Sequence, residues 1–428
     1  MRSISFLPLA CLAMAAPAYS QAPAVYETGV MLQAADLLPA EILRGPAYRV
    51  RDQVPTDGFL AHFEIDSDFG TFRAIGVPQA KRRIVEIAAI RTLVNTSKSD
   101  LFAEGMKRSI EQPIDAVKNI VTNPVDSVKQ APKTVGHFFG KLGRSIGRGA
   151  EKVADRVEEA NKQPGGPDAG EAAAEAGRGI GNAAKSAAGF DMAKLQTAKQ
   201  LGVDPYSDNR MLQEEMDKVT WAFFAGGMPL RVVTTVASAG IAVAATQMVG
   251  IPEDTYALTE GEINLRDENA LAAMGVSEED VKAFELSRVL STTRRHLIAT
   301  QLTALPHANG RGLIVRLANS CETPEQADIL ISALAILVER QKSGAADYVS
   351  LKVLGRLPGA TTATGELHVP APVDHVTWTE EVAGFAGRDD LGDAPKVLIH
   401  TGRLSQDAAA GILAAGWKTI AVAYPGDR

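Results

Sequence analysis

The side chains best suited to chemistry gather near the C-terminus of the chain. They are His368, Asp374, His375, Glu380, Glu381 and His400. Imidazoles and carboxylates act as general acids, general bases and metal ligands. His400 closes the apolar run 396–400, which has the character of a buried strand. At the carboxyl end of such a strand, where open α/β sheets bind ligands, Gly402 and a helix starting at Ser405 would offer backbone amides to an anion.

The spacing of these residues is nevertheless a weak signal for catalysis. Two prolines separate His368 from His375, and no pattern fixes a shared metal ion. The weak catalytic candidates are therefore His400, His375 and Asp374, and we expect no metal and no cofactor. Such histidines more commonly lie at the surface or at the end of a strand. The chain contains no nucleophile elbow, Walker loop, zinc-protease helix or paired CxxC.

A thiol nucleophile is a second chemical possibility. Cys321 would need His296 or His307 as its base. A lone cysteine before a capping threonine is weak evidence, and a buried, inert thiol is the commoner case. Arg294 and Arg295, next to His296, are expected on a solvated helix face.

The elements that must position the C-terminal residues form a small α/β unit over 346–428. Strand-like runs cover 348–354, 366–369, 375–378, 396–400 and 419–423, and a capped helix covers 405–415. A strand, a helix and a strand within about thirty residues make a βαβ unit, so the last two strands should be parallel.

Residues 191–345 predict a helical domain with clear helix starts. Residues 208–212 lead into one helix, and Ser277 and Thr323 each stand where a capping side chain is favoured. Residues 232–251 carry no charge over a length that could cross a bilayer. Small residues dominate this run and acidic residues follow it, which favours a buried core helix or helical hairpin over a membrane-inserting segment.

The N-terminal part predicts export and then a small α+β unit. Residues 1–20 have a positive start, an apolar core and a small-x-small site at Ala18–Ser20, so they are a predicted signal peptide. Residues 21–98 show a hairpin pattern around 66–69 and a helix from Pro78 to about Asn95. The charged residues of that helix (Lys81, Arg82, Arg83 and Glu86) are expected to face outward.

An arm over 99–162 repeats its apolar residues every eleven positions, and a Gly/Ala/Pro-rich linker over 163–190 follows it. Prolines 113, 124 and 132 divide the arm into kinked amphipathic helices. Between 113 and 150, six basic and two acidic residues give a local charge of +4. The residues expected to bind an anionic membrane or a partner are Phe138, Phe139, Leu142, Lys118, Lys129, Lys133, Lys141, Arg144 and Arg148.

Composition excludes one broad class of function. A net charge of -7, a pI near 5.6 and 5% aromatic residues argue against a nucleic-acid binder. The sequence thus predicts a mostly α protein with smaller α/β parts: an N-terminal β-hairpin plus helix, a kinked amphipathic helical arm, a central helical domain and a C-terminal βαβ-containing unit.

The leading functional hypothesis is an exported, non-enzymatic protein of a bacterial envelope, periplasmic or extracellular, which docks through its arm on an anionic membrane surface or on another envelope protein. One alternative is an enzyme or small-ligand binder with a pocket at the end of the His400 strand. The other is a membrane-inserting protein that uses residues 232–251.

Overall fold

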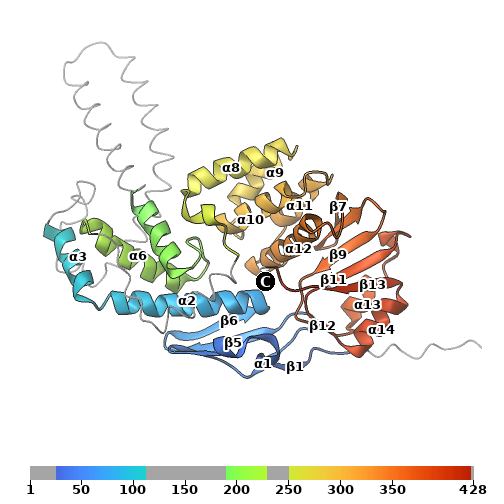
Figure 1. Cartoon of the computed structure of the whole chain (residues 1–428), viewed down its shortest axis with the longest axis horizontal. Helices are drawn as coiled ribbons and strands as arrows, with labels where there is room; N and C mark the ends of the chain where they lie inside the picture. The colour runs from blue at the N-terminus through green and yellow to red at the C-terminus, as the bar shows by residue number, and fades with distance from the viewer. Residues whose placement is uncertain (1–25, 112–188, 229–249, 426–428) are drawn as a thin grey trace, which may run out of the picture.

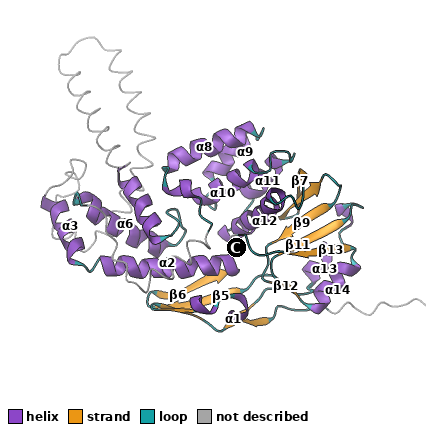
Figure 2. Cartoon of the chain, in the orientation of Figure 1, coloured by secondary structure: helices purple, strands orange, loops and turns teal. Residues whose placement is uncertain are grey.

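The computed structural model describes residues 26–111, 189–228 and 250–425 (Figure 1). The chain is a mixed α/β protein in which helices predominate (Figure 2). The predicted signal peptide, the arm from residue 112 onward and the linker up to residue 188 lie outside the described residues. So does the uncharged run 232–251, except for its last two residues.

The N-terminal part contains a four-stranded antiparallel sheet in the order β2-β3-β5-β6. Its strands are β2 (Arg44–Gly45), β3 (Tyr48–Val50), β5 (His62–Ser67) and β6 (Gly70–Ile75). Two further strands, β1 (Met31–Gln33) and β4 (Gln53–Pro55), pair with each other, and the short helices α1 (Ala34–Leu37) and η1 (Ala40–Ile42) lie between them in the chain. Phe63 and Ile65 alternate inward along β5 and pack with Ile84 and Ile87 of the following helix.

That helix is α2 (Val77–Thr96), and it also packs on a group of helices. The group consists of α3 (Asp100–Glu111), a helix over residues 189–201 and α6 (Arg210–Ala225). Asn209 caps α6 by accepting a hydrogen bond from the amide of Leu212. A side chain at Gly105 of α3 would lie 2.7 Å from the carbonyl oxygen of Ala222, so close packing of α3 on α6 requires glycine there.

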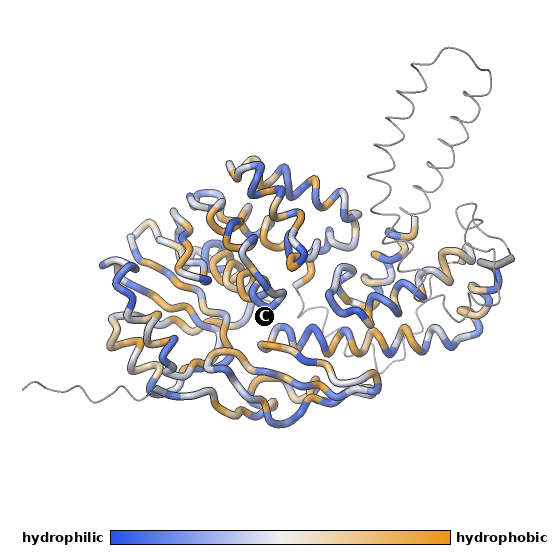
Figure 3. The backbone as a smooth tube through the Cα atoms, turned by 180° about the vertical axis from the view of Figure 1, so that it is seen from behind, coloured by the Kyte–Doolittle hydropathy of each residue, from blue (hydrophilic) through white to orange (hydrophobic). Residues whose placement is uncertain are grey.

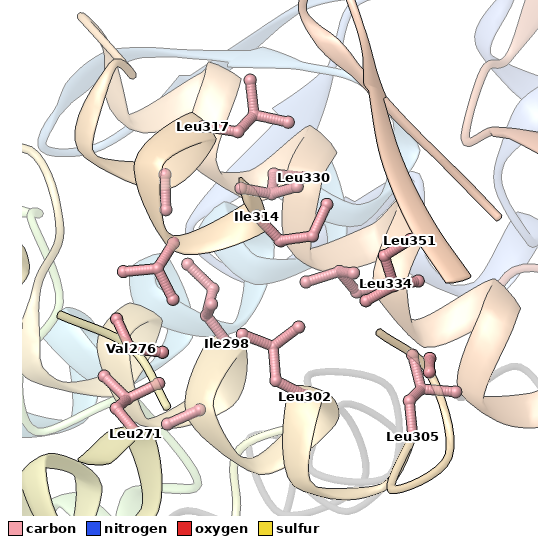
Figure 4. Close-up of a cluster of buried hydrophobic side chains, with 14 of the residues drawn as sticks. Leu271, Val276, Ile298, Leu302, Leu305, Ile314, Leu317, Leu330, Leu334 and Leu351 are labelled. Carbon is pink, nitrogen blue, oxygen red and sulfur yellow. The ribbon is translucent and has the colours of Figure 1, made fainter. Parts of the chain in front are cut away.

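The middle of the chain forms a compact set of helices. They are η3 (Glu253–Tyr256), α8 (Glu260–Ala273), α9 (Glu278–Leu286), α10 (Thr292–Thr303), α11 (Arg311–Asn319) and α12 (Pro324–Lys342). Ser277, Ser291 and Thr323 cap α9, α10 and α12 through their side-chain oxygens. Figure 4 shows their shared core, in which Ile298 and Leu302 meet side chains from neighbouring elements. In Figure 3 these helices alternate between hydrophilic and hydrophobic residues, as helices with one buried face do.

The C-terminal sheet has five strands in the order β13-β11-β9-β8-β7. They are β7 (Tyr348–Leu354), β8 (Leu357–Thr362), β9 (Leu367–Ala371), β11 (Lys396–His400) and β13 (Trp417–Ala421). β11 runs parallel to β9 and β13, whereas β8 is antiparallel to both of its neighbours. A short parallel pair, β10 (His375–Val376) and β12 (Arg403–Leu404), lies beyond the carboxyl ends of β9 and β11.

Helices cover both faces of this sheet (Figure 1). Val397 and Ile399 of β11 pack with Ile336 of α12 on one face. On the other face, Leu398 and its neighbours pack with α13 (Glu380–Ala386) and α14 (Gln406–Ala414), and the short helix η4 (Asp389–Leu391) closes that side. Successive side chains of β11 therefore point to opposite faces of the sheet and belong to two separate cores.

No helix within the three described ranges is both long enough and apolar enough to cross a membrane.

Candidate functional site

Asp374 is a buried anchor between the two ends of the chain. Its carboxylate accepts hydrogen bonds from the amide of Ala61 at 2.9 Å, the amide of Val77 at 3.2 Å and the hydroxyl of Tyr424 at 2.6 Å. Burial raises the pKa of Asp374, although these hydrogen bonds oppose the shift. All three partners belong to the protein, so the carboxylate holds the N-terminal sheet and the C-terminal segment together.

The histidines of the C-terminal unit have partners of different kinds. His400 is buried, and its Nδ1 lies 2.7 Å from the carbonyl oxygen of Gly402, to which it donates. Burial lowers the pKa of His375, and the nearby Glu27 opposes that shift. Burial also lowers the pKa of His368, whose Nδ1 lies 3.1 Å from the hydroxyl of Tyr348. His400 thus lies at a strand end, as expected for a histidine of this kind, although it is buried, and His368 is buried near the start of β9.

The predicted thiol and base have separate environments. Burial raises the pKa of Cys321, which is the opposite of thiol activation, and its Sγ contacts the carbonyl of Leu317. His296 lies instead between two carboxylates, 2.8 Å from Asp267 and 3.2 Å from Asp254. These contacts fix α10 to α8 and η3.

The predicted membrane- or partner-binding residues lie outside the described residues. This applies to Lys118, Lys129, Lys133, Phe138, Phe139, Lys141, Leu142, Arg144 and Arg148.

The most distinctive site is an apolar pocket of about 300 Å³ between the C-terminal sheet and α13 and α14. Strands and helices of that unit supply most of its wall, and the loop before β5 and helix α12 supply the rest. The lining residues are Phe59, Leu60, Ile329, Leu357, Ala371, Pro372, Val373, Val376, Glu381, Val382, Phe385, Ala386, Leu398, Ile412 and Trp417. Among them, Glu381 alone carries a charge, and it is exposed at the surface.

Two aromatic rings give one side of this pocket a fixed shape. The indole Nε1 of Trp417 donates a hydrogen bond of 2.9 Å to the carbonyl of Ala386, which satisfies its polar atom. The Phe385 ring lies 5.9 Å from the Trp417 ring, and the guanidinium of Arg388 lies 5.7 Å from the Phe385 ring. The pocket therefore presents pre-positioned apolar surface to a ligand.

A second cavity of about 260 Å³ adjoins the apolar pocket, and we call it the polar cavity. The first half of α2, the inner faces of α10 and α12, and Tyr424 surround it. Leu60, Ile329 and Pro372 line both cavities and so form the wall between them.

A chain of six charges lies beside the polar cavity, and all but Asp208 are buried or half-buried. In order they are Arg82, Asp328, Arg294, Asp208, Arg83 and Glu86, and each neighbouring pair is an ion pair with a nitrogen–oxygen distance of 2.6 to 3.0 Å. Burial opposes ionisation of Arg294, but the carboxylates of Asp328 and Asp208 outweigh it, so the pKa of Arg294 is raised. This ion-pair chain fastens α2, α10, α12 and the start of α6 to one another.

The structure contradicts two expectations that charged residues of α2 and α10 face solvent. Lys81 and Glu86 are buried rather than outward, with exposed fractions of 7% and 1%. Arg294 and Arg295 are 5% and 6% exposed, so the expected solvated face of α10 is wrong as well. Helical periodicity alone predicts that these residues are exposed, because it cannot show which distant segments pack on them; Glu86, for example, accepts hydrogen bonds from Ser207 and Asn209.

Comparisons of the chain with family models, with curated proteins and with solved structures gave no match. Any proposal about function therefore rests on the arrangement of the described residues. The catalytic candidates are engaged in hydrogen bonds within the protein or shielded by burial, whereas the apolar pocket has room for a ligand and few polar groups to satisfy.

Proposed function

We propose that this protein is an exported, non-enzymatic binding protein of the cell envelope that holds an apolar small molecule in the pocket between the C-terminal sheet and α13 and α14. The observation that carries the proposal is the lining itself, in which aromatic and aliphatic side chains surround the space and the one charged side chain is exposed. Ligand sites are commonly concave and apolar, and in open α/β sheets they lie near the carboxyl ends of strands. Ala371 ends β9 opposite His400, so the pocket reaches that edge, although His400 itself does not line it; Leu398 and Trp417 extend the pocket across the face of the sheet.

The lining predicts how affinity should depend on the ligand. Each methylene group moved from water into the pocket contributes up to about 0.8 kcal/mol, so a series of straight-chain alcohols should bind about fourfold more tightly per added carbon until the pocket is full. Calorimetric titration of the series with the mature chain measures this slope. A flat series would contradict binding in an apolar pocket.

The site is tested by filling it. Val382→Phe adds a ring on the pocket side of α13, and Ala383→Phe adds a ring on the same helix at a position that does not line the pocket. A neutral fluorescent probe such as N-phenyl-1-naphthylamine should lose at least about tenfold in affinity for the first variant and keep its affinity for the second. Leu357→Phe fills the pocket from the opposite side and serves as the second filling variant. Equal probe binding by all four proteins would refute the assignment.

We propose separately that the arm docks on an anionic membrane surface or on an envelope partner, supported by its eleven-residue period and local charge of +4. The test is flotation with vesicles that contain phosphatidylglycerol or only phosphatidylcholine. The deletion should span 112–160 and leave α3 in place, because α3 packs on α6. The full chain should float with the anionic vesicles alone, and the deleted chain should not. Equal flotation of both chains would sink this proposal.

The membrane-inserting alternative depends on residues 232–251. Carbonate extraction of membranes from the exporting cell separates it from the other two proposals. A peripheral or soluble protein should be released by the extraction, and an inserted protein should stay with the membrane.

A further inference from the structure

The polar cavity differs from the apolar pocket in the groups that it presents. Glu325, Asp328 and Ser332 follow one another along one face of α12 and line it, and Gln301 of α10 lies across from them. Asp328 is already paired with Arg82 and Arg294. Hydrogen-bond acceptors that line the cavity beside Asp328 include the carboxylate of Glu325 and the side-chain oxygens of Gln301 and Ser332.

Two of these acceptors have capacity to spare. The Oε1 atom of Gln301 is buried and has no hydrogen-bond partner among the described residues. The carboxylate of Glu325 is half-buried, and within the described ranges it accepts one side-chain hydrogen bond, from Nε2 of Gln79 at 3.4 Å. A buried acceptor without a donor costs free energy, which a donor on a ligand would recover.

The wall between the cavities consists of side chains. Leu60 and Ile329 are half-buried and line both spaces, together with the buried Pro372. A leucine or isoleucine side chain can change rotamer without movement of the backbone. A ligand with an apolar chain in the pocket can thus extend past this wall and place its other end among the acceptors of the polar cavity.

From this we infer that the ligand is an amphiphile with an ammonium head, which donates to Glu325 and Gln301 while its apolar chain fills the pocket lined by Trp417 and Phe385. The inference rests on the proposed function, because it uses the same pocket for the chain. Charge favours this class of head group: the ionisable side chains lining the polar cavity include two carboxylates, Glu325 and Asp328, and one guanidinium, Arg82, which is paired with Asp328. A carboxylate head would meet like charge there.

The test compares three probes with the same chain and different heads: dodecylamine, dodecanol and dodecanoate. Calorimetric titration of the mature chain should rank them amine, alcohol, carboxylate, with the amine at least about tenfold tighter than the alcohol. Glu325→Gln should remove most of the amine's advantage and leave the affinity for dodecanol unchanged. Glu322→Gln is the matched control, because Glu322 is exposed and does not line the cavity.

The outcomes separate the two proposals. Equal affinity for all three heads, or an amine preference that survives Glu325→Gln, overturns the inference about the head group. If dodecanol still binds in that case and Val382→Phe abolishes its binding, the proposed function as an apolar-ligand binder stands and only the inference about the ammonium head fails. If none of the three probes binds, both proposals fail.

Discussion

Replacing Asp328 by asparagine should weaken the protein far more than loss of an ordinary surface ion pair. Asp328 accepts from Arg82 at 3.0 Å and from Arg294 at 2.8 Å, and the Arg294 side chain is only 6% exposed. The amide side chain would keep the shape of the carboxylate and lose its charge, which leaves a guanidinium buried without its full counter-charge. Removing one partner of a buried ion pair typically costs about 3–5 kcal/mol. Asp208 still faces Arg294, so we expect the lower part of this range.

The matched control is Asp52→Asn, which removes a carboxylate from an exposed pair. Asp52 lies 2.7 Å from Arg49, and the two side chains are 63% and 54% exposed. Such pairs contribute about 0–1 kcal/mol. Urea unfolding, followed by circular dichroism and by tryptophan fluorescence, measures both free energies and shows whether the two signals change together.

Acidification adds a second readout. The pKa of Asp328 is lowered, because Arg82 and Arg294 together outweigh the effect of its burial. A carboxyl whose folded-state pKa is depressed contributes stability above its unfolded pKa of about 3.9 and loses it as the pH falls through the folded value. The difference in the free energy of unfolding between wild type and Asp328→Asn should therefore shrink below about pH 4. A free-energy loss as small as that of Asp52→Asn, or a gap that widens in acid, would refute the reasoning.

Other substitutions test local packing and charge. Gly411→Ala should lower the free energy of unfolding by about 1–3 kcal/mol, because its new methyl group would lie 2.4 Å from the Trp378 ring. An unchanged free energy of unfolding would show that the Trp378 ring moves aside. Gly384→Ala, which meets no atom within 4 Å, should raise stability by up to about 1 kcal/mol in the same unfolding assay. A hydrogen bond to Asp267 raises the pKa of His296, so His296→Gln should cost more stability at about pH 6 than at about pH 9, and the reverse order would contradict that charge state.

Much of the regular structure could be predicted from local sequence signals. Capping residues mark helix starts because a side-chain oxygen satisfies an otherwise free amide, as Ser277 does for Asp280 and Thr323 does for Gln326. The apolar run 396–400 and the helix ended by Gly416 likewise predict β11, α14 and β13 in order. These signals depend on neighbours in the sequence, so they can be read without the fold.

The candidate site could be predicted only in part. The edge of the sheet near His400 follows from the βαβ pattern, but the pocket there also needs Phe59 from the loop before β5 and Ile329 from α12. No short motif links these distant segments. The role of Asp374 was missed for the same reason, because its partners Ala61 and Val77 lie about three hundred residues earlier in the chain. The buried position of Arg294 and the half-buried position of Arg82 likewise depend on long-range pairing.

The most direct test of the central claim is quenching of Trp417 by a brominated dodecanol. Bromine quenches an indole at contact, and an alcohol head keeps the result independent of the inference about ammonium. We predict saturable quenching in the wild type and loss of most of it in Trp417→Phe, while calorimetry shows that the variant still binds the alcohol. The other two tryptophans, Trp221 in α6 and Trp378, do not line the pocket and should stay unquenched. Saturable binding with unchanged quenching in Trp417→Phe would contradict the assignment of the pocket.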